Sequence, residues 1–432
     1  MERHRRAELP HADRGLAAGI DPQRLVAHHA GVQATPILTK VNPTTKAASL
    51  APQPSSVFGL IDYRDPALLP ASTAPYDFKV LLLEVLVANS RVAAFASQVT
   101  LQANQLFAEK ATLAGGTDNN ILFDGTYQSA NGHGSYSFLL AAASKLTITS
   151  AVLREVDLAR GEFVTAVQPS AATIETRFLM WGTLRFEALT GFDAFAFDSL
   201  AFANLAVDMA VTPSADQALP ASKVMTFDAN HLSFDLDQST ARPESLYAAF
   251  PLRLATFVQA GPDTKPTDLD YAPVATPLTP GDLGAPWFGL IMQLELGGQG
   301  AWAPGGSFTA NLVVAWGASE GDEPNAFVGL QLPGTSGGQL QITLEGPLKL
   351  SLKSVSFSVD DGGAYLMWMQ SLALGFFGLT FPPTGRTDIL LFAKGNGKRT
   401  LGWYAVYDKG SSVQQAGGNQ QQGAGQKQVT AG

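Results

Sequence analysis

Three residues of the chain have types and spacing suited to acid–base chemistry: Asp235, Asp237 and His231. Asp235 and Asp237 are two apart in the alternating segment LSFDLDQ, so an extended strand would place both carboxyl groups on one face. A pair of carboxyl groups about 5–9 Å apart is the catalytic unit of many glycosidases. His231 lies close in sequence to Asp228 and Asp235, as a Ser–His–Asp arrangement would need. We favour turn and solvated-strand roles, because no G-x-S-x-G elbow accompanies these residues.

Other polar residues have the chemistry of a metal site without its spacing. Glu320, Asp322 and Glu323 lie together in SEGDEPN, and calcium prefers such clustered oxygens. The segment lacks the D-x-[DN]-x-[DN]-G spacing of a calcium loop, so a charged loop is the favoured interpretation. The chain has no cysteine, which excludes disulfides and thiolate metal sites. We therefore expect no metal or cofactor.

Aromatic and apolar residues offer two candidate binding surfaces. Trp302 and Trp316 flank the segment SFTANLVVAW, and an exposed indole at either end would stack on a sugar or a partner. Packing in the core or at its rim is the favoured role of both. An apolar face containing Leu372, Phe376 and Phe377 would bind a hydrophobic ligand if it stays open.

The elements that must position these residues are strands. Apolar and polar residues alternate in LQITLEGPLKLSLKSVSFSV, which gives a strand one dry and one wet face. Hydrophobic residues make up 46% of the chain and charged residues 15%, and the 42 Gly and 26 Pro supply many turns. The sequence predicts an all-β fold with few helices: an elongated antiparallel sheet or sandwich, with an open curled sheet as an alternative.

Two segments give finer predictions about the strands. In FDSLAFANLAVDMAV the apolar positions change parity, and Asn204 is the natural position for a bulge or turn there. Residues 91–111 have a partly helix-favouring composition, but they keep a period of two and are predicted as strand. The sequence Asp360-Asp361-Gly362-Gly363 between two strands is typical of a hairpin turn.

Composition divides the chain into five parts. Residues 1–55 lack sustained periodicity and are expected to be mobile, apart from a candidate short helix near residues 22–30. Residues 56–260 form a first β region, and the Pro/Asp-rich residues 261–286 form a connecting loop. Residues 287–409 form a second β region. Residues 410–432 are a Gly/Gln-rich tail, expected to be disordered.

Charge and hydropathy limit the partners. A net charge of −9 gives no electrostatic reason to expect nucleic-acid binding. No apolar run approaches the roughly 20 residues that span a bilayer, and no signal peptide is recognisable. We expect no transmembrane segment; the cytoplasm is the default location, with export by another route left open.

Residues 78–107, 232–254 and 352–393 together resemble an uncharacterised family of very large bacterial β-rich proteins. This resemblance implies that the chain is the C-terminal part of a longer protein, and it implies no activity. The recurrence of apolar strand, Gly/Asn turn and apolar strand also resembles the β-grooves of AsmA/TamB-type lipid-transport proteins.

Three functions remain open on these grounds. A non-catalytic structural or protein-interaction module, binding a partner protein or its own copies, agrees best with the period-two pattern and the weak motifs. A lipid or hydrophobic-ligand groove is the first alternative. A carbohydrate-active or other hydrolase on a β scaffold is the second.

Overall fold

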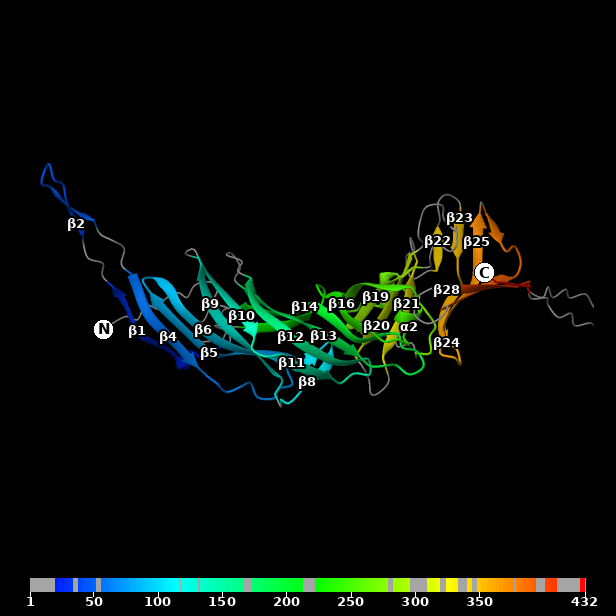
Figure 1. Ribbon diagram of the computed structural model, residues 1–432, viewed down its shortest axis with the longest axis horizontal. Helices are drawn as coiled ribbons and strands as arrows, with labels where there is room; N and C mark the ends of the chain where they lie inside the picture. The colour runs from blue at the N-terminus through cyan, green and yellow to red at the C-terminus, as the bar shows by residue number, and fades with distance from the viewer. Residues whose placement is uncertain are drawn as a thin grey trace, which may run out of the picture.

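The computed structural model is an elongated molecule with its N- and C-terminal regions at opposite ends (Figure 1). Most of the described residues lie in strands and few lie in helices, and the several sheets are antiparallel, which confirms the all-β prediction. The structure describes residues 20–33, 38–51, 56–116, 118–130, 133–166, 173–212, 222–278, 283–295, 309–318, 324–332, 340–343, 348–376, 378–393, 401–409 and 428–431.

The first sheet has 14 strands within the described residues and forms the N-terminal part of the body. Its strands are β1 (Leu25–Gln33), β4 (Ser56–Arg64), β5 (Tyr76–Ala88), β6 (Arg91–Ala103), β7 (Gln105–Leu106), β8 (Glu109–Leu113), β9 (Asn120–Ala130), β10 (His133–Leu140), β11 (Ser144–Ile148), β12 (Leu153–Ala166), β13 (Ile174–Phe186), β14 (Phe197–Thr212), β15 (Ser222–Asp228) and β16 (Ser233–Ala241). The order runs β1-β4-β5-β6-β9-β10-β12-β13-β14, and β15 and β16 both pair with β14. The strand predicted within residues 91–111 is thus confirmed by β6.

The first sheet rolls around its apolar face. Phe78 on β5 lies 5.8 Å from Phe163 on β12 and 5.7 Å from Phe178 on β13, measured between ring centroids. Because β6, β9 and β10 separate β5 from β12 in the sheet, these contacts cross the inside of the roll. The Lys223 ammonium on β15 donates a hydrogen bond to the Phe78 carbonyl oxygen at 3.2 Å, so β15 at one edge of the sheet lies against β5 across the roll.

The parity change predicted at Asn204 is confirmed as a β-bulge. Met180 pairs with Leu205 and Gly182 with Phe202, so two residues of β14 oppose one residue of β13. Asn204 has a φ of 66°, a left-handed conformation that asparagine adopts more readily than most residues. The bulge also separates two neighbours, because β16 pairs with the part of β14 before it and β15 with the part after it.

The second sheet has five described strands and begins before residue 261. Its strands are β17 (Leu252–Gln259), β18 (Ala272–Pro273), β19 (Trp287–Glu295), β20 (Thr309–Gly317) and β21 (Ala326–Gln331). Since β17 pairs with β19, residues 261–286 lie between two strands of one sheet.

The described part of residues 261–286 packs on the second sheet because β20 is apolar on both faces. Leu312 and Val314 contact the main core, whereas Val313 and Ala315 belong to a second cluster on the opposite face. Tyr271, from the connecting segment, covers that second face. A strand buried on both faces requires cover on both, and the Pro/Asp-rich segment provides one of the two layers.

The third sheet has eight described strands at the C-terminal end of the body. Its strands are β22 (Gln341–Thr343), β23 (Leu348–Ser351), β24 (Ser354–Val359), β25 (Tyr365–Phe376), β26 (Leu379–Phe381), β27 (Arg386–Ala393), β28 (Leu401–Asp408) and β29 (Gln428–Ala431). The predicted turn between β24 and β25 is confirmed, since Asp360 Oδ1 accepts hydrogen bonds from the Gly362 and Ala364 amides at 2.9 and 2.7 Å.

Two parts of the chain expected to be mobile contain strands. β1 lies inside residues 1–55 and pairs with β4 over most of its length. β29 lies inside the Gly/Gln-rich tail and pairs with β28. Both strands are held in place by backbone pairing with a neighbouring strand. The local sequence pattern does not reveal such pairing. The candidate helix near residues 22–30 is only the 3-10 turn Pro22–Arg24, followed at once by β1.

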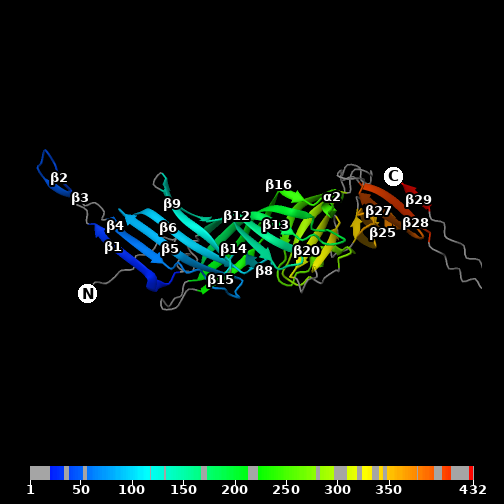
Figure 2. The same ribbon diagram turned by 60° about the horizontal axis from the view of Figure 1, so that its bottom comes forward.

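The other helices within the described residues are short: α2 (Leu246–Ala249) and the 3-10 turn Pro266–Leu269. Within the described residues, no helix has the length and hydrophobicity needed to cross a membrane. A separate hairpin of β2 (Leu38–Val41) and β3 (Ala48–Ala51) projects from the N-terminal end in both views (Figures 1 and 2).

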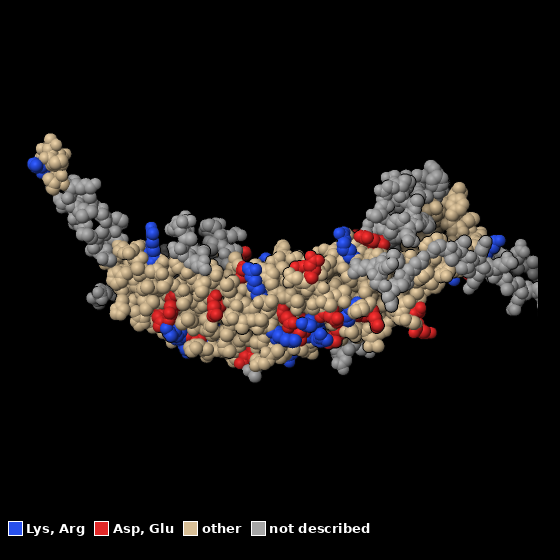
Figure 3. Space-filling view, viewed as in Figure 1, with Lys and Arg blue, Asp and Glu red and all other residues tan. Residues whose placement is uncertain are grey.

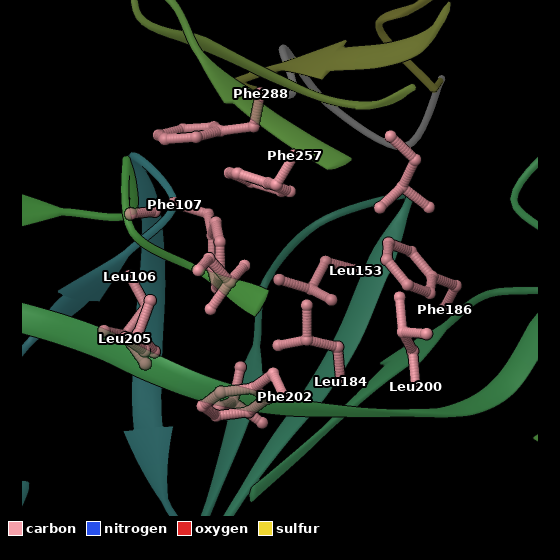
Figure 4. Packing of buried hydrophobic residues seen from close by; sticks show 14 of the residues in the cluster. Leu106, Phe107, Leu153, Leu184, Phe186, Leu200, Phe202, Leu205, Phe257 and Phe288 are labelled. Atoms are coloured by element: carbon pink, nitrogen blue, oxygen red, sulfur yellow. The ribbon is translucent and has the colours of Figure 1, made fainter. Parts of the chain in front are cut away.

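One apolar cluster joins the sheets. Phe107, in the turn between β7 and β8, lies 5.3 Å from Phe288 of β19 between ring centroids (Figure 4). Phe192, just before β14, lies 6.2 Å from Phe357 of β24. All four side chains are buried in the same cluster. The three sheets therefore share a core.

Candidate protein-interaction surface

The structure gives Asp235 a local structural role. Its Oδ1 accepts a hydrogen bond from the Asp237 amide at 3.0 Å, and its Oδ2 accepts one from Gln238 Nε2 at 2.7 Å. The register of β16 against β14 shifts after Asp235, so the regular alternation ends there. Both carboxylates are exposed. Asp235 thus supports an irregular part of β16.

The structure does not join His231 to either predicted acidic partner by a described hydrogen bond. His231 is exposed in the turn between β15 and β16. Asp228 accepts hydrogen bonds from Arg177 at 3.0 Å and from the Asn230 amide at 2.9 Å. The bond from Asn230 stabilises the turn, and the bond from Arg177 forms an ion pair. His133 begins β10, and its side chain lies outside the described residues.

The metal candidates Glu320, Asp322 and Glu323 lie outside the described residues. Among the residues that are described, no group of three or more His, Cys, Asp or Glu side chains is placed to hold a metal ion.

Trp316 is fully buried, with 0% of its surface exposed, which excludes the exposed-indole alternative for this residue. Its ring lies 5.6 Å from Phe186 and 5.5 Å from Phe195 between centroids, both edge-on. The reason is that β20 is the middle strand of a sheet covered on both faces. Trp302 lies outside the described residues.

The apolar face predicted near the third sheet is described in part. Leu372 is half-buried, the side chain of Phe376 is outside the described set, and so is Phe377. Two neighbours on β26 are open to solvent: Leu379 is 61% exposed and Phe381 is 50% exposed. Apolar surface is therefore available at this end of the molecule.

A larger apolar surface lies at the opposite end, on residues that the sequence reasoning did not single out. We call it the open end and define it by six exposed apolar side chains of β1, β4 and β5: Leu25, Val26, Val32, Val57, Phe58 and Leu86. Val32 is 68% exposed and its cross-strand partner Val57 is 47% exposed.

The side chains of the open end are exposed because the opposite wall of the roll meets β5 and not β1 or β4. β4 pairs with residues 82–87 of β5, whereas Lys223 of β15 reaches Phe78 in the other half of that strand. β1 and β4 therefore extend the sheet past the roll. Val57 and the buried Tyr63 have the same parity on β4, so Val57 lies on the face that the roll buries elsewhere. It is exposed because no opposing strand of the described part of the roll covers it.

The edge of the open end has little protection. Among the described residues β1 pairs with β4 alone, so its other side presents free backbone groups. Its sequence, LVAHHAGVQ, contains no Lys, Arg, Asp or Glu. The one protective device is a register shift between His28 and Gly31, where His29 has a φ of 50°. Natural sheets usually protect such an edge with charged residues.

Charged side chains gather instead over the middle of the body on the face shown in Figure 3. Arg177 forms a two-pronged pair with Asp208 at 2.6 and 2.7 Å and also contacts Asp228 at 3.0 Å. Arg185 joins Glu155 and Asp157 at 3.0 and 3.1 Å. These cations are already paired with carboxylates.

The fold and this surface define an all-β protein with an uncharged, free sheet edge. Comparison with family models, with curated proteins and with solved structures finds no match to the chain.

Proposed function

We propose that the protein is a non-catalytic interaction module that binds a partner polypeptide at its open end. The free edge of β1 supports the proposal most directly, because an extended segment adds to such an edge through main-chain hydrogen bonds. Exposed apolar side chains on both faces of the same strands would provide the contacts that stabilise an added segment. Because β1 contains no Lys, Arg, Asp or Glu, it would not repel an added segment of either charge.

Site-specific photo-crosslinking in the source cells tests this proposal. A photo-crosslinking amino acid replaces Phe58 at the open end, and a matched variant carries it at Val224, which is also exposed but lies on β15. We expect discrete protein adducts from position 58 and none of the same mass from position 224. Equal adducts at both positions, or none at position 58, would contradict the proposal.

An apolar-ligand function is the second candidate, and the exposed Leu379 and Phe381 on β26 favour it. Native mass spectrometry followed by organic extraction tests it. Co-purified lipid at fixed stoichiometry, lost in a Leu379→Ser, Phe381→Ser variant, is the expected result. A protein whose mass is unchanged by extraction would rule this candidate out.

A further inference from the structure

The roll of the first sheet closes along the line where β15 lies against β5, and we call this line the seam. Residues 76–80 of β5 pair with β6 on one side, and no described strand pairs with them on the other. Among the described strands, β15 likewise pairs with β14 alone. The backbone ladder of the sheet therefore stops on both sides of the seam.

Lys223 of β15 bridges the seam. Its ammonium donates hydrogen bonds to the Phe78 carbonyl oxygen at 3.2 Å and to Oδ1 of Asp77. The same carboxylate oxygen accepts a hydrogen bond from the Phe78 amide at 2.8 Å. Side chains thus satisfy both backbone groups of Phe78, in place of the strand that a continuous sheet would provide there.

The two ends of β15 are held in different ways. At the C-terminal end, the ring of Phe227 lies 5.0 Å from that of Phe107 between centroids, and Asp228 pairs with Arg177 at 3.0 Å. At the N-terminal end, the described polar contacts that reach beyond β14 are those of Lys223. If the contacts of Lys223 break, the C-terminal end stays anchored and the N-terminal end is free to move.

β15 has little burial of its own. None of its seven residues is buried, whereas Val207 and Met209 of the neighbouring β14 are fully buried. Met225 is partly buried against the main core. Across the seam, Phe78 is 2% exposed and contacts Phe178 inside the roll. Segments with few buried contacts open at a lower free energy than the core does, so β15 can open while β14 stays folded.

We propose that β15 is a strap that opens the roll, with Lys223 as its latch and Phe227 as its pivot. Opening separates the N-terminal half of β15 from the seam and gives access to the apolar interior beside Phe78. The side chains of Lys223 and Asp77 are 26% and 32% exposed, so dissolved ions compete with the latch. The strap is independent of the proposed function, because the open end uses β1, β4 and residues 82–87 of β5.

Hydrogen exchange of the full chain, followed by mass spectrometry, gives the first test. Lys223→Met removes both bonds across the seam, and the protected amides of residues 222–226 should exchange about tenfold faster, because a charge-assisted hydrogen bond is lost. The amides of β13 should exchange at an unchanged rate. Lys79→Met is the matched control, since Lys79 lies on β5 and pairs with Asp65 at 3.0 Å, outside β15. Far-UV circular dichroism checks that both variants fold.

Three outcomes of this experiment would overturn the strap. Unchanged exchange of residues 222–226 in Lys223→Met would show that Lys223 does not hold β15. Equal acceleration in β15 and β13 would show that the whole sheet opens together. Equal acceleration of β15 by Lys79→Met would show that the effect does not depend on contacts across the seam.

Thiol labelling gives the second test, and the signal is specific because the chain has no cysteine. A bulky thiol reagent is added to a Met225→Cys protein and, as the control, to a Met209→Cys protein, whose cysteine lies on the buried face of β14. Adding Lys223→Met should speed labelling at position 225 by about tenfold and leave position 209 slow. Labelling at position 225 that is no faster than at position 209 would overturn the strap, because β15 would then open only when β14 unfolds.

Discussion

Arg242 is the residue with the densest set of hydrogen bonds at the junction of the sheets. Its guanidinium pairs with both carboxylate oxygens of Asp193 at 2.6 and 2.8 Å. It also donates to the carbonyl oxygens of Phe186 and Phe197 at 3.0 Å each. Burial lowers the pKa of Arg242, but its hydrogen bonds to Asp193 and Asp198 and the negative charges of those carboxylates together outweigh burial and leave that pKa above its ordinary value. Arg242 therefore stays charged.

Replacing Arg242 with Met should be strongly destabilising. It leaves the buried Asp193 carboxylate without its cation, which costs about 3–5 kcal/mol of unfolding free energy. Urea unfolding measures the loss. Asp198→Asn serves as the control, because Asp198 is exposed and its 3.4 Å contact with Arg242 should contribute less than about 1 kcal/mol. Equal losses in the two variants would contradict this account.

Tyr271 makes stability sensitive to alkaline pH. Burial raises the pKa of its hydroxyl from 10.0 to about 12. Between these values the unfolded chain loses the proton and the folded chain keeps it, so the unfolding free energy falls as pH rises. The contribution is complete below pH 10 and is lost as pH rises through about 12. Unfolding midpoints measured across this window should fall less steeply for Tyr271→Phe than for the natural chain.

At the scale of the elements, the bulge at Asn204 decides which apolar residues of β14 face the core. Asn204→Gly should change stability little, because glycine adopts a left-handed φ without strain. Asn204→Val should cost about 1–2 kcal/mol, the penalty for a side chain that resists this conformation. Urea unfolding measures the unfolding free energy of both variants. An equal loss in the two would show that Asn204 is not needed for its left-handed backbone conformation.

At the scale of the whole molecule, the shared core predicts cooperative unfolding. The Tyr365 hydroxyl of the third sheet accepts a hydrogen bond from the Asp193 amide at 3.0 Å and donates one to the Glu244 carbonyl oxygen at 3.2 Å. Ala275 forms a bridge with Ser356 of β24. We expect the fluorescence of the buried Trp287 and Trp316 and the far-UV circular dichroism to report one common transition. Two separated transitions would show that the sheets are independent.

The sequence by itself determined the all-β class, the bulge at Asn204 and the turn at Asp360. These features depend on local chemistry: the period of a strand, a parity change, and a carboxylate followed by glycines. Each is encoded within about ten residues, so no knowledge of distant strands is needed.

Only the tertiary structure decided the rest. Rolling of the first sheet depends on contacts such as Phe78 with Phe178, a hundred residues apart in sequence. Packing on both faces of the second sheet buries Trp316, whereas β4 extends past the roll and leaves Val57 exposed, although both lie in apolar strands. In the second sheet, Tyr271 of the Pro/Asp-rich segment also forms part of a layer over β20. Local periodicity shows which residues alternate, but which face is finally covered depends on strands that the chain supplies elsewhere.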